Sequence, residues 1–153
     1  IAMNQVNSIV VHYTANPGST ALQNRNYFEG LKDSHETMAS SHFIVGLDGE
    51  IVQCIPTNEI SYASNDRNND TVSIECCHAD ATGQFNQQTY DSLVELTAYL
   101  IGKFHLTTDD VIRHYDVTGK KCPLYYVEHE DAWQQFLKDV DAYIDAHGVV
   151  QEE

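Results

Sequence analysis

The chain has 153 residues, which suits one ordinary domain with a buried core, so we expect a single domain over residues 1–153. Hydrophobic residues make up 42% of the chain and charged residues 20%, which is the balance of a globular protein and excludes a wholly disordered one. The 8 basic residues against 23 acidic ones give a formal net charge of -15, and this field would repel a polymer of phosphates, so we expect no nucleic acid partner.

The first half of the chain alternates strand-like and helical segments. Residues 8–13 (SIVVHY) form an almost unbroken apolar run rich in β-branched residues, which is typical of a strand covered on both faces. Residues 20–38 carry moderate helical character. The strand-like residues 42–45 and 50–55 are joined through residues 48–49 (DG), a strong hairpin signal, so we expect these two strands to pair.

The second half adds further strands and two longer helical patterns. A short strand is expected at residues 71–76 and another buried one at residues 111–114. Between residues 87 and 104 apolar side chains recur at spacings of three and four, so one stripe of a helix must face the core. Residues 133–144 indicate a closing amphipathic helix. The sum predicts an α/β domain in which helices flank a central mixed sheet of about five strands.

Two histidines and a cysteine occupy positions that suit a metal site. His12 lies at the carboxyl end of the first strand, His114 lies at the end of the last, and Cys122 follows in a polar loop. Two imidazoles and a thiolate are good zinc ligands, and a catalytic zinc site uses three protein ligands and leaves the fourth position to water. The spacing alone is not specific, because it matches neither CxxC nor HExxH, so core packing of all three side chains is the competing interpretation.

Four segments of the chain resemble one known enzyme family. They are VVHYTA around His12, SSHFIVGLDGEIVQCIP over residues 40–56, SIEC around Glu75, and VIRHYDVTGKKCP over residues 111–123. Their order resembles that of the type 2 N-acetylmuramoyl-L-alanine amidases, which are related to phage lysozyme-type amidases and to the peptidoglycan recognition proteins. The resemblance runs from about Ser8 to Phe136. The last segment resembles the branch of Bacillus and Clostridium autolysins and phage endolysins.

This resemblance implies a fold, a reaction and a set of residues. The fold is that of the recognition proteins and type 2 amidases, and the reaction is zinc-dependent hydrolysis of the amide bond between N-acetylmuramic acid and L-alanine in peptidoglycan. His12, His114 and Cys122 would bind Zn²⁺. Glu75 would be the general base that takes a proton from the zinc-bound water, and Lys120 would stabilise the oxyanion. A carboxyl group on the otherwise apolar strand of Glu75 is also expensive to bury unpaired, which favours a functional role.

The chain departs from the family pattern at two positions. Relatives often carry an aromatic residue just before the position of His42, where this chain has Ser41, so we expect no tyrosine-assisted mechanism and assign the chemistry to Glu75 and Lys120. Relatives also often carry a histidine where this chain has Tyr62, so contacts of that loop with the substrate are expected to differ.

Four residues are candidates for substrate contacts: His42, Tyr62, Asn65 and Thr118. For His42, which begins a strand beside the expected cleft, a hydrogen bond to the peptide stem and a structural role both remain open. The resemblance places the other three in loops near the substrate groove. The remaining histidines are expected to be surface groups, and they are His35, His78, His105, His129 and His147.

The expected partner is peptidoglycan, through its glycan strand and peptide stem, bound by a monomeric domain. No apolar run approaches the roughly 20 residues that span a bilayer, and the first residues lack the basic region of a signal peptide. We expect a secreted or wall-associated protein, or a phage protein released at lysis. Two alternatives are a non-catalytic peptidoglycan-binding module, which the retention of Cys122 argues against, and an amidase restricted to soluble muropeptides.

Overall fold

A computed structural model of the protein describes residues 3, 5–34 and 40–148, excepting the side chains of residues 31–34. Its strands form one sheet of five in the order β3-β2-β4-β1-β5. They are β1 Ser8–Tyr13, β2 Phe43–Val45, β3 Ile51–Gln53, β4 Thr71–Cys76 and β5 Val111–Arg113. Strands β2, β4, β1 and β5 run parallel and β3 is antiparallel to β2, so the prediction of a mixed sheet with flanking helices is confirmed.

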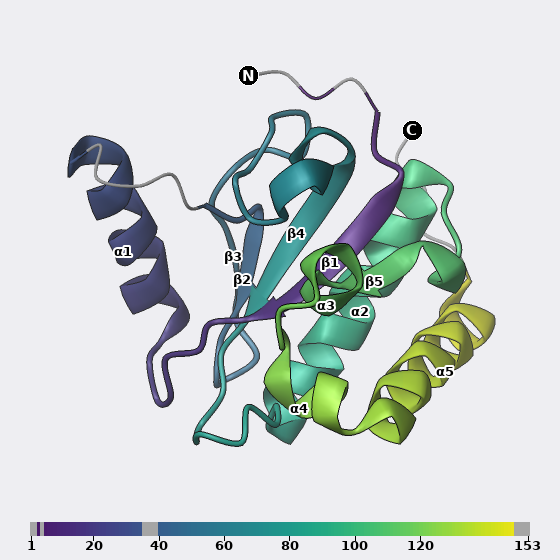
Figure 1. Ribbon diagram of the computed structural model, residues 1–153. Helices are drawn as coiled ribbons and strands as arrows, with labels where there is room; N and C mark the ends of the chain where they lie inside the picture. Colours follow the sequence, from purple (N-terminus) through teal and green to yellow (C-terminus); the bar gives the residue numbers. More distant parts are fainter. Residues whose placement is uncertain (1–2, 4, 35–39, 149–153) are drawn as a thin grey trace.

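The helices lie on both faces of this sheet. They are α1 Ala21–Ser34, α2 Gln87–Phe104, α3 His114–Thr118, α4 Leu124–Glu128 and α5 Glu130–His147, with the 3-10 helices η1 Asn65–Asp70 and η2 Thr108–Asp110. Figure 1 shows α2 and α5 side by side against one face, and α1 beside β2 and β3 on the other. The predicted long helices therefore exist, with α1 described only to Ser34 because residues 35–39 lie outside the described part of the chain.

Strand alternation divides the side chains of β1 and β4 between the two faces. Ile9 and Val11 of β1, with Ile74 of β4, belong to the core cluster that packs against α2 and α5. Neighbouring residues on a strand point to opposite faces, so His12 and Glu75 face away from this core. The same parallel register sets His12 directly beside Glu75. The α2–α5 side thus supplies the larger apolar core, and the opposite face carries His12 and Glu75 as well as a smaller apolar cluster beside α1.

Boundaries differ from the sequence-based expectation where short elements are involved. The strand expected at residues 111–114 ends at Arg113, and His114 instead begins α3. The hairpin strand expected at residues 50–55 covers only Ile51–Gln53. The expected hairpin itself is confirmed by the antiparallel pairing of β2 and β3, and Gly49 at its turn has a φ of 83° that favours glycine.

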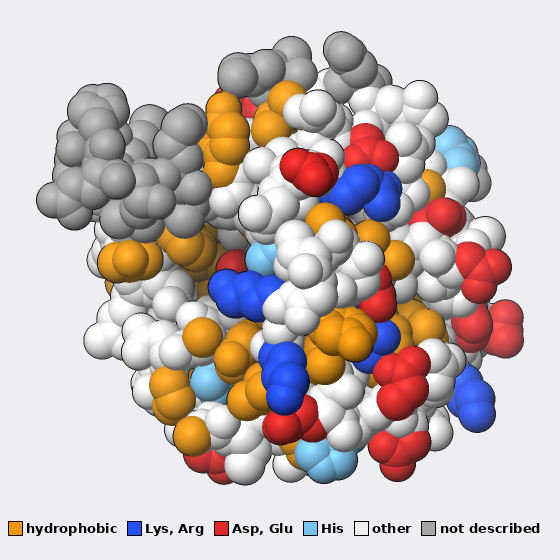
Figure 2. Space-filling model, viewed as in Figure 1, with side chains coloured by type: hydrophobic (Ala, Val, Ile, Leu, Met, Phe, Trp, Pro, Cys, Tyr) orange, Lys and Arg blue, Asp and Glu red, His pale blue; other side chains and the backbone are white. Residues whose placement is uncertain are grey.

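Charge is distributed unevenly over the surface. Figure 2 shows basic side chains near the middle of the face on which α3 lies, and acidic ones gathered toward α5. The sequence of α5 alone contributes Glu130, Asp131, Asp139, Asp141 and Asp145. Much of the negative charge in this view therefore lies to one side of α3. Among the helices that the structure describes, none is long and apolar enough to cross a bilayer.

Candidate metal centre

The candidate site forms where three neighbouring parallel strands end. His12 lies near the carboxyl end of β1, and Glu75 is its partner on β4. On the other side of β1, Val11 pairs with Arg113, so His114 follows β5 at the same edge of the sheet. The carboxyl ends of parallel strands are the usual place for ligand sites in open α/β sheets. The topology therefore brings together side chains that are far apart in the sequence.

His12, His114 and Cys122 form a compact group of potential metal ligands. One ligand atom from each lies within 4.8 Å of the others, and all three side chains are buried. The imidazole centroids are 4.7 Å apart, and Cys122 Sγ lies 3.7 Å from His12 Nδ1. Nitrogen and sulfur ligands of one tetrahedral zinc ion lie roughly 3.3–3.7 Å apart, by the usual zinc–ligand distances. The donor set therefore suits zinc, and the separation of Cys122 Sγ and His12 Nδ1 lies at the upper end of this range.

The loop after α3 folds back to deliver Cys122. Helix α3 is followed by Gly119, which has a φ of 82° and donates its N–H to the carbonyl of Tyr115 at 2.8 Å. The backbone N–H of Tyr115 then donates to the carbonyl of Cys122 at 3.0 Å, and the N–H of Cys122 donates to the carbonyl of Lys120 at 2.7 Å. These bonds hold the cysteine beside the first turn of α3, where His114 lies.

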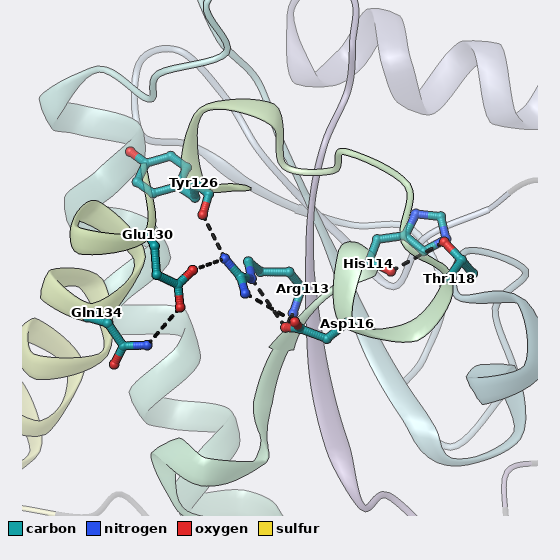
Figure 3. A network of polar contacts seen from close by, with 7 residues as sticks. All are labelled: Arg113, His114, Asp116, Thr118, Tyr126, Glu130 and Gln134. Atoms are coloured by element: carbon teal, nitrogen blue, oxygen red, sulfur yellow. Dashed lines mark hydrogen bonds and ion pairs between the residues drawn. The ribbon is translucent and has the colours of Figure 1, made fainter. Parts of the chain in front are cut away.

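A buried arginine fixes the start of α3. Figure 3 shows the guanidinium of Arg113 between Asp116, the carbonyl of Tyr126 and the carboxylate of Glu130. Arg113 Nη1 donates to the Tyr126 carbonyl at 2.9 Å, and the backbone N–H of Arg113 donates to Asp116 Oδ2 at 2.9 Å. Because these partners belong to α3, α4 and α5, the network anchors the segment that carries His114.

Burial sets the charge states of the three ligands. Desolvation, with the nearby charges of His114 and Lys120, lowers the pKa of His12 to about 3, and desolvation lowers the pKa of His114 as well. Desolvation raises the pKa of the Cys122 thiol to about 12. Before a metal binds, the site therefore holds neutral imidazoles, which are ready ligands, and a protonated thiol, which must lose its proton.

Glu75 and Lys120 lie beside these ligands. Burial raises the pKa of Glu75 to about 8, and the positive charge of Lys120 opposes this shift. Among the described residues, Glu75 Oε2 is buried and has no hydrogen-bond partner. Lys120 is exposed, yet its charge reaches the site, where it also opposes the rise in the pKa of Cys122. A buried carboxyl oxygen without a partner is costly, so a position beside the candidate metal site accounts for it better than packing does.

The chain was compared with known proteins. Residues 2–124 match the family model described as N-acetylmuramoyl-L-alanine amidase. The chain belongs to this amidase family. The amidase CwlL of Bacillus licheniformis is 35% identical over 152 residues, which cover 91% of this chain and 42% of CwlL. The chain thus spans less than half the length of that curated relative.

Solved structures show that amidase-family domains share this fold. The catalytic domain of XlyA aligns with a TM-score of 0.74 and 30% identity, over 92% of this chain and 88% of that domain. The structure of PlyL aligns with a TM-score of 0.77 over 91% of this chain and 85% of PlyL, and at 24% identity it supports the fold alone. The expected membership in the type 2 amidase family is confirmed.

His42 lies just before β2 and is buried in this amidase-family domain. Its ring is fully buried, with Nε2 donating to the carbonyl of Glu59 at 2.6 Å and Nδ1 accepting from the N–H of Ser73 at 3.1 Å. The hydroxyl of Ser61 lies 3.2 Å from the same Nδ1. Because protein groups engage both ring nitrogens, this placement favours a structural role over a hydrogen bond to the peptide stem.

Two other substrate candidates lie in surface segments around the site. Tyr62 is half-buried, and its backbone is paired with Ser40, whose hydroxyl accepts the Tyr62 N–H at 2.8 Å. Thr118 ends α3, and its hydroxyl lies 3.5 Å from the carbonyl of His114 and accepts the N–H of Lys120 at 3.2 Å. Figure 3 shows Thr118 directly beside His114. Thr118 therefore stabilises the turn that leads from His114 to Lys120.

Asn65 contacts a candidate metal ligand directly. Its Oδ1 lies 2.7 Å from His114 Nε2. The adjacent Ser64, which the sequence analysis did not single out, places its hydroxyl 3.2 Å from His12 Nε2. Serine is common in loops, so the sequence carries no signal that distinguishes Ser64, whereas the family resemblance pointed to Asn65 as a substrate contact.

The remaining histidines divide into surface and buried groups. The expectation that His78 lies on the surface is wrong, because its ring is 1% exposed and Nδ1 donates to the carbonyl of Asp80 at 2.7 Å. His78 follows the buried strand β4 by two residues, and this position could have predicted its burial. The histidines confirmed as exposed are His105, His129 and His147. His35 lies outside the described residues.

Proposed function

We propose that this chain is a zinc-dependent catalytic domain that hydrolyses the amide bond between N-acetylmuramic acid and L-alanine in peptidoglycan. The observation that carries the proposal is the buried group of His12, His114 and Cys122, whose ligand atoms lie within 4.8 Å of one another. Its neighbour Glu75 holds a carboxylate oxygen without a partner among the described residues. We infer the bond to be cut from the family and from relatives that are named N-acetylmuramoyl-L-alanine amidases.

The proposed mechanism divides the work among five side chains. His12, His114 and Cys122 would hold a zinc ion, which supplies polarisation of the amide carbonyl and lowers the pKa of water to about 7. Glu75 accepts the proton of the attacking water and delivers it to the departing nitrogen of L-alanine. Such general acid–base catalysis contributes about 100- to 10,000-fold. The ammonium of Lys120 stabilises the negative charge that develops on the carbonyl oxygen.

The test combines metal content with wall hydrolysis. Purified protein is expected to contain about one zinc ion per chain, as three-ligand catalytic zinc sites do, and to release free L-alanine amino termini from purified sacculi. Cys122→Ser keeps the size of the side chain but replaces the thiolate, so both zinc content and release should fall together. Sacculi left intact by the zinc-loaded protein, with no new amino termini, would exclude the proposed wall hydrolase.

The same assay separates the two alternatives. Soluble muropeptides are offered beside sacculi, and the products are identified by mass spectrometry. Cleavage of the soluble fragments alone would replace the wall-lytic proposal with an amidase for small muropeptides. Binding to sacculi without cleavage of either substrate would indicate a peptidoglycan-binding module. We further propose that the domain acts as a monomer outside the cell, secreted or wall-associated, or as a phage protein released at lysis.

A further inference from the structure

Two adjacent loop residues contact both histidines of the candidate metal centre. Ser64 Oγ lies 3.2 Å from His12 Nε2, and Asn65 Oδ1 lies 2.7 Å from His114 Nε2. We propose that Ser64 and Asn65 form a paired positioning element that holds both imidazoles with Nδ1 directed at the metal. This inference rests on the zinc site of the proposed function and adds the residues that orient its ligands.

The contacts of each ring leave Nδ1 as the nitrogen for the metal. The amide oxygen of Asn65 can only accept, so His114 Nε2 carries the proton and the free lone pair lies on Nδ1. In His12, Nδ1 is the nitrogen that lies 3.7 Å from Cys122 Sγ, while Nε2 is directed at the Ser64 hydroxyl. Metal-bound histidines commonly donate their other ring N–H to such a partner, which fixes ring orientation and tautomer.

The loop that carries the pair is held by contacts of its own. Ser64 is 1% exposed; its backbone N–H donates to Asn68 Oδ1 at 2.7 Å, and its carbonyl accepts the N–H of Arg67 at 3.0 Å. Asn65 has a φ of 53°, a left-handed conformation that asparagine tolerates better than most residues. The hydroxyl of Ser61, just upstream, bonds the Ser73 hydroxyl of β4 at 2.8 Å. The pair is therefore placed by protein contacts.

The first experiment measures the zinc dissociation constant by chelator competition. Asn65→Gly removes the side chain and keeps the positive φ accessible, and it is expected to weaken zinc binding about 10- to 100-fold. Asn65→Asp restores the acceptor oxygen and should recover most of the affinity. Ser64→Ala tests the other half of the pair, with a loss of about 10-fold expected.

The matched control is Asn86→Gly. Asn86 caps α2, where its side chain accepts the N–H of Thr89 at 2.8 Å and donates to the carbonyl of Leu47 at 2.9 Å, and no metal-ligand contact is lost. It should lower stability slightly and leave zinc affinity unchanged. Zinc affinity of both Asn65→Gly and Ser64→Ala equal to that of this control would overturn the inference.

The second experiment reads the ring tautomers by ¹⁵N NMR in the metal-free protein. Wild-type His114 should carry its proton on Nε2, and Asn65→Gly should give a mixture of both neutral tautomers, a change that a general loss of stability does not produce. An unchanged tautomer would overturn the inference whatever the affinities. A wild type that binds no zinc but shows this tautomer change would refute the proposed function while retaining the positioning contact.

Discussion

At the scale of single residues, Glu75 combines features that packing alone does not favour. It belongs to a strand whose other residues are buried, its Oε2 has no partner among the described residues, and burial raises its pKa to about 8. A raised pKa makes the ionised carboxylate a stronger proton acceptor, which suits a general base once the group has lost its own proton. The neighbouring cation of Lys120 keeps the ionised form accessible by opposing the shift.

Glu75→Gln should separate chemistry from metal binding. The amide has nearly the shape of the carboxyl group but cannot accept the proton of water, so kcat should fall about 100- to 10,000-fold. Zinc content should stay at the wild-type level, because His12, His114 and Cys122 are unchanged. The checks are sacculus hydrolysis beside metal analysis of the same preparation. Activity within about threefold of wild type would remove Glu75 from the mechanism and leave another group to act as base.

Zinc affinity should depend on pH through Cys122. Its thiol has a pKa raised to about 12 and must release one proton when it binds a metal, whereas the pKa values of His12 and His114 are lowered, so both rings are already neutral at pH 7. The apparent association constant should therefore rise by at least about tenfold per pH unit from about pH 6.5 to 9, because the nearby Glu75, with a pKa of about 8, also ionises in this range. Competition titrations across this range measure the slope. Cys122→Ser should flatten it, and a wild-type constant independent of pH would contradict the assigned ligand set.

At the scale of elements, predictability follows length and periodicity. Helix α2 could be predicted because its apolar residues repeat over 18 positions, and its buried residues Leu93, Leu100 and Ile101 lie on the expected stripe. Helices α3 and α4 have five residues each, too few for a period to be recognised. Their positions depend on contacts of Arg113 with groups distant in the sequence, which no local pattern encodes.

Arg113→Lys should test how strongly this network holds α3. Lysine keeps the charge but loses the planar fork that reaches Asp116, Glu130 and the Tyr126 carbonyl together, so unfolding free energy should fall by about 1–3 kcal/mol. Arg25→Lys is the matched control, since the contacts of Arg25 among the described residues are a surface ion pair with Glu29 and a hydrogen bond to the exposed Asn26, and it should cost less than about 0.5 kcal/mol. Denaturant unfolding of both metal-free variants measures the two free energies of unfolding. Equal decreases would show that the network contributes no more stability than a surface ion pair.

At the scale of the whole molecule, the parallel register creates the site. His12 and Cys122 are separated by 110 residues, and only the order β4-β1-β5 brings Glu75, His12 and His114 to one edge. The residue types and their places at strand ends suggested a metal site. Their spacing in the sequence could not show that the three ligands meet, so this inference depended on the family resemblance. The contacts of Ser64 and Asn65 with the rings required the folded structure, because they arise from a loop without a distinctive sequence.

A metal bound by these ligands connects β1, the first turn of α3 and the loop that follows it, so it should stabilise the fold as a unit. Free zinc at 100 times its dissociation constant contributes about 2.7 kcal/mol, which corresponds to roughly 5–10 °C in Tm for a chain of this size. Removing zinc with a chelator should therefore lower Tm by this amount in calorimetry. Cys54→Ser, at a half-buried cysteine of the separate cluster beside α1, should keep the full chelator effect. In Cys122→Ser the chelator should no longer lower Tm, because without the thiolate the remaining imidazoles bind zinc too weakly to connect these elements. A fall in Tm of wild-type size in Cys122→Ser would show that the stabilising metal binds elsewhere.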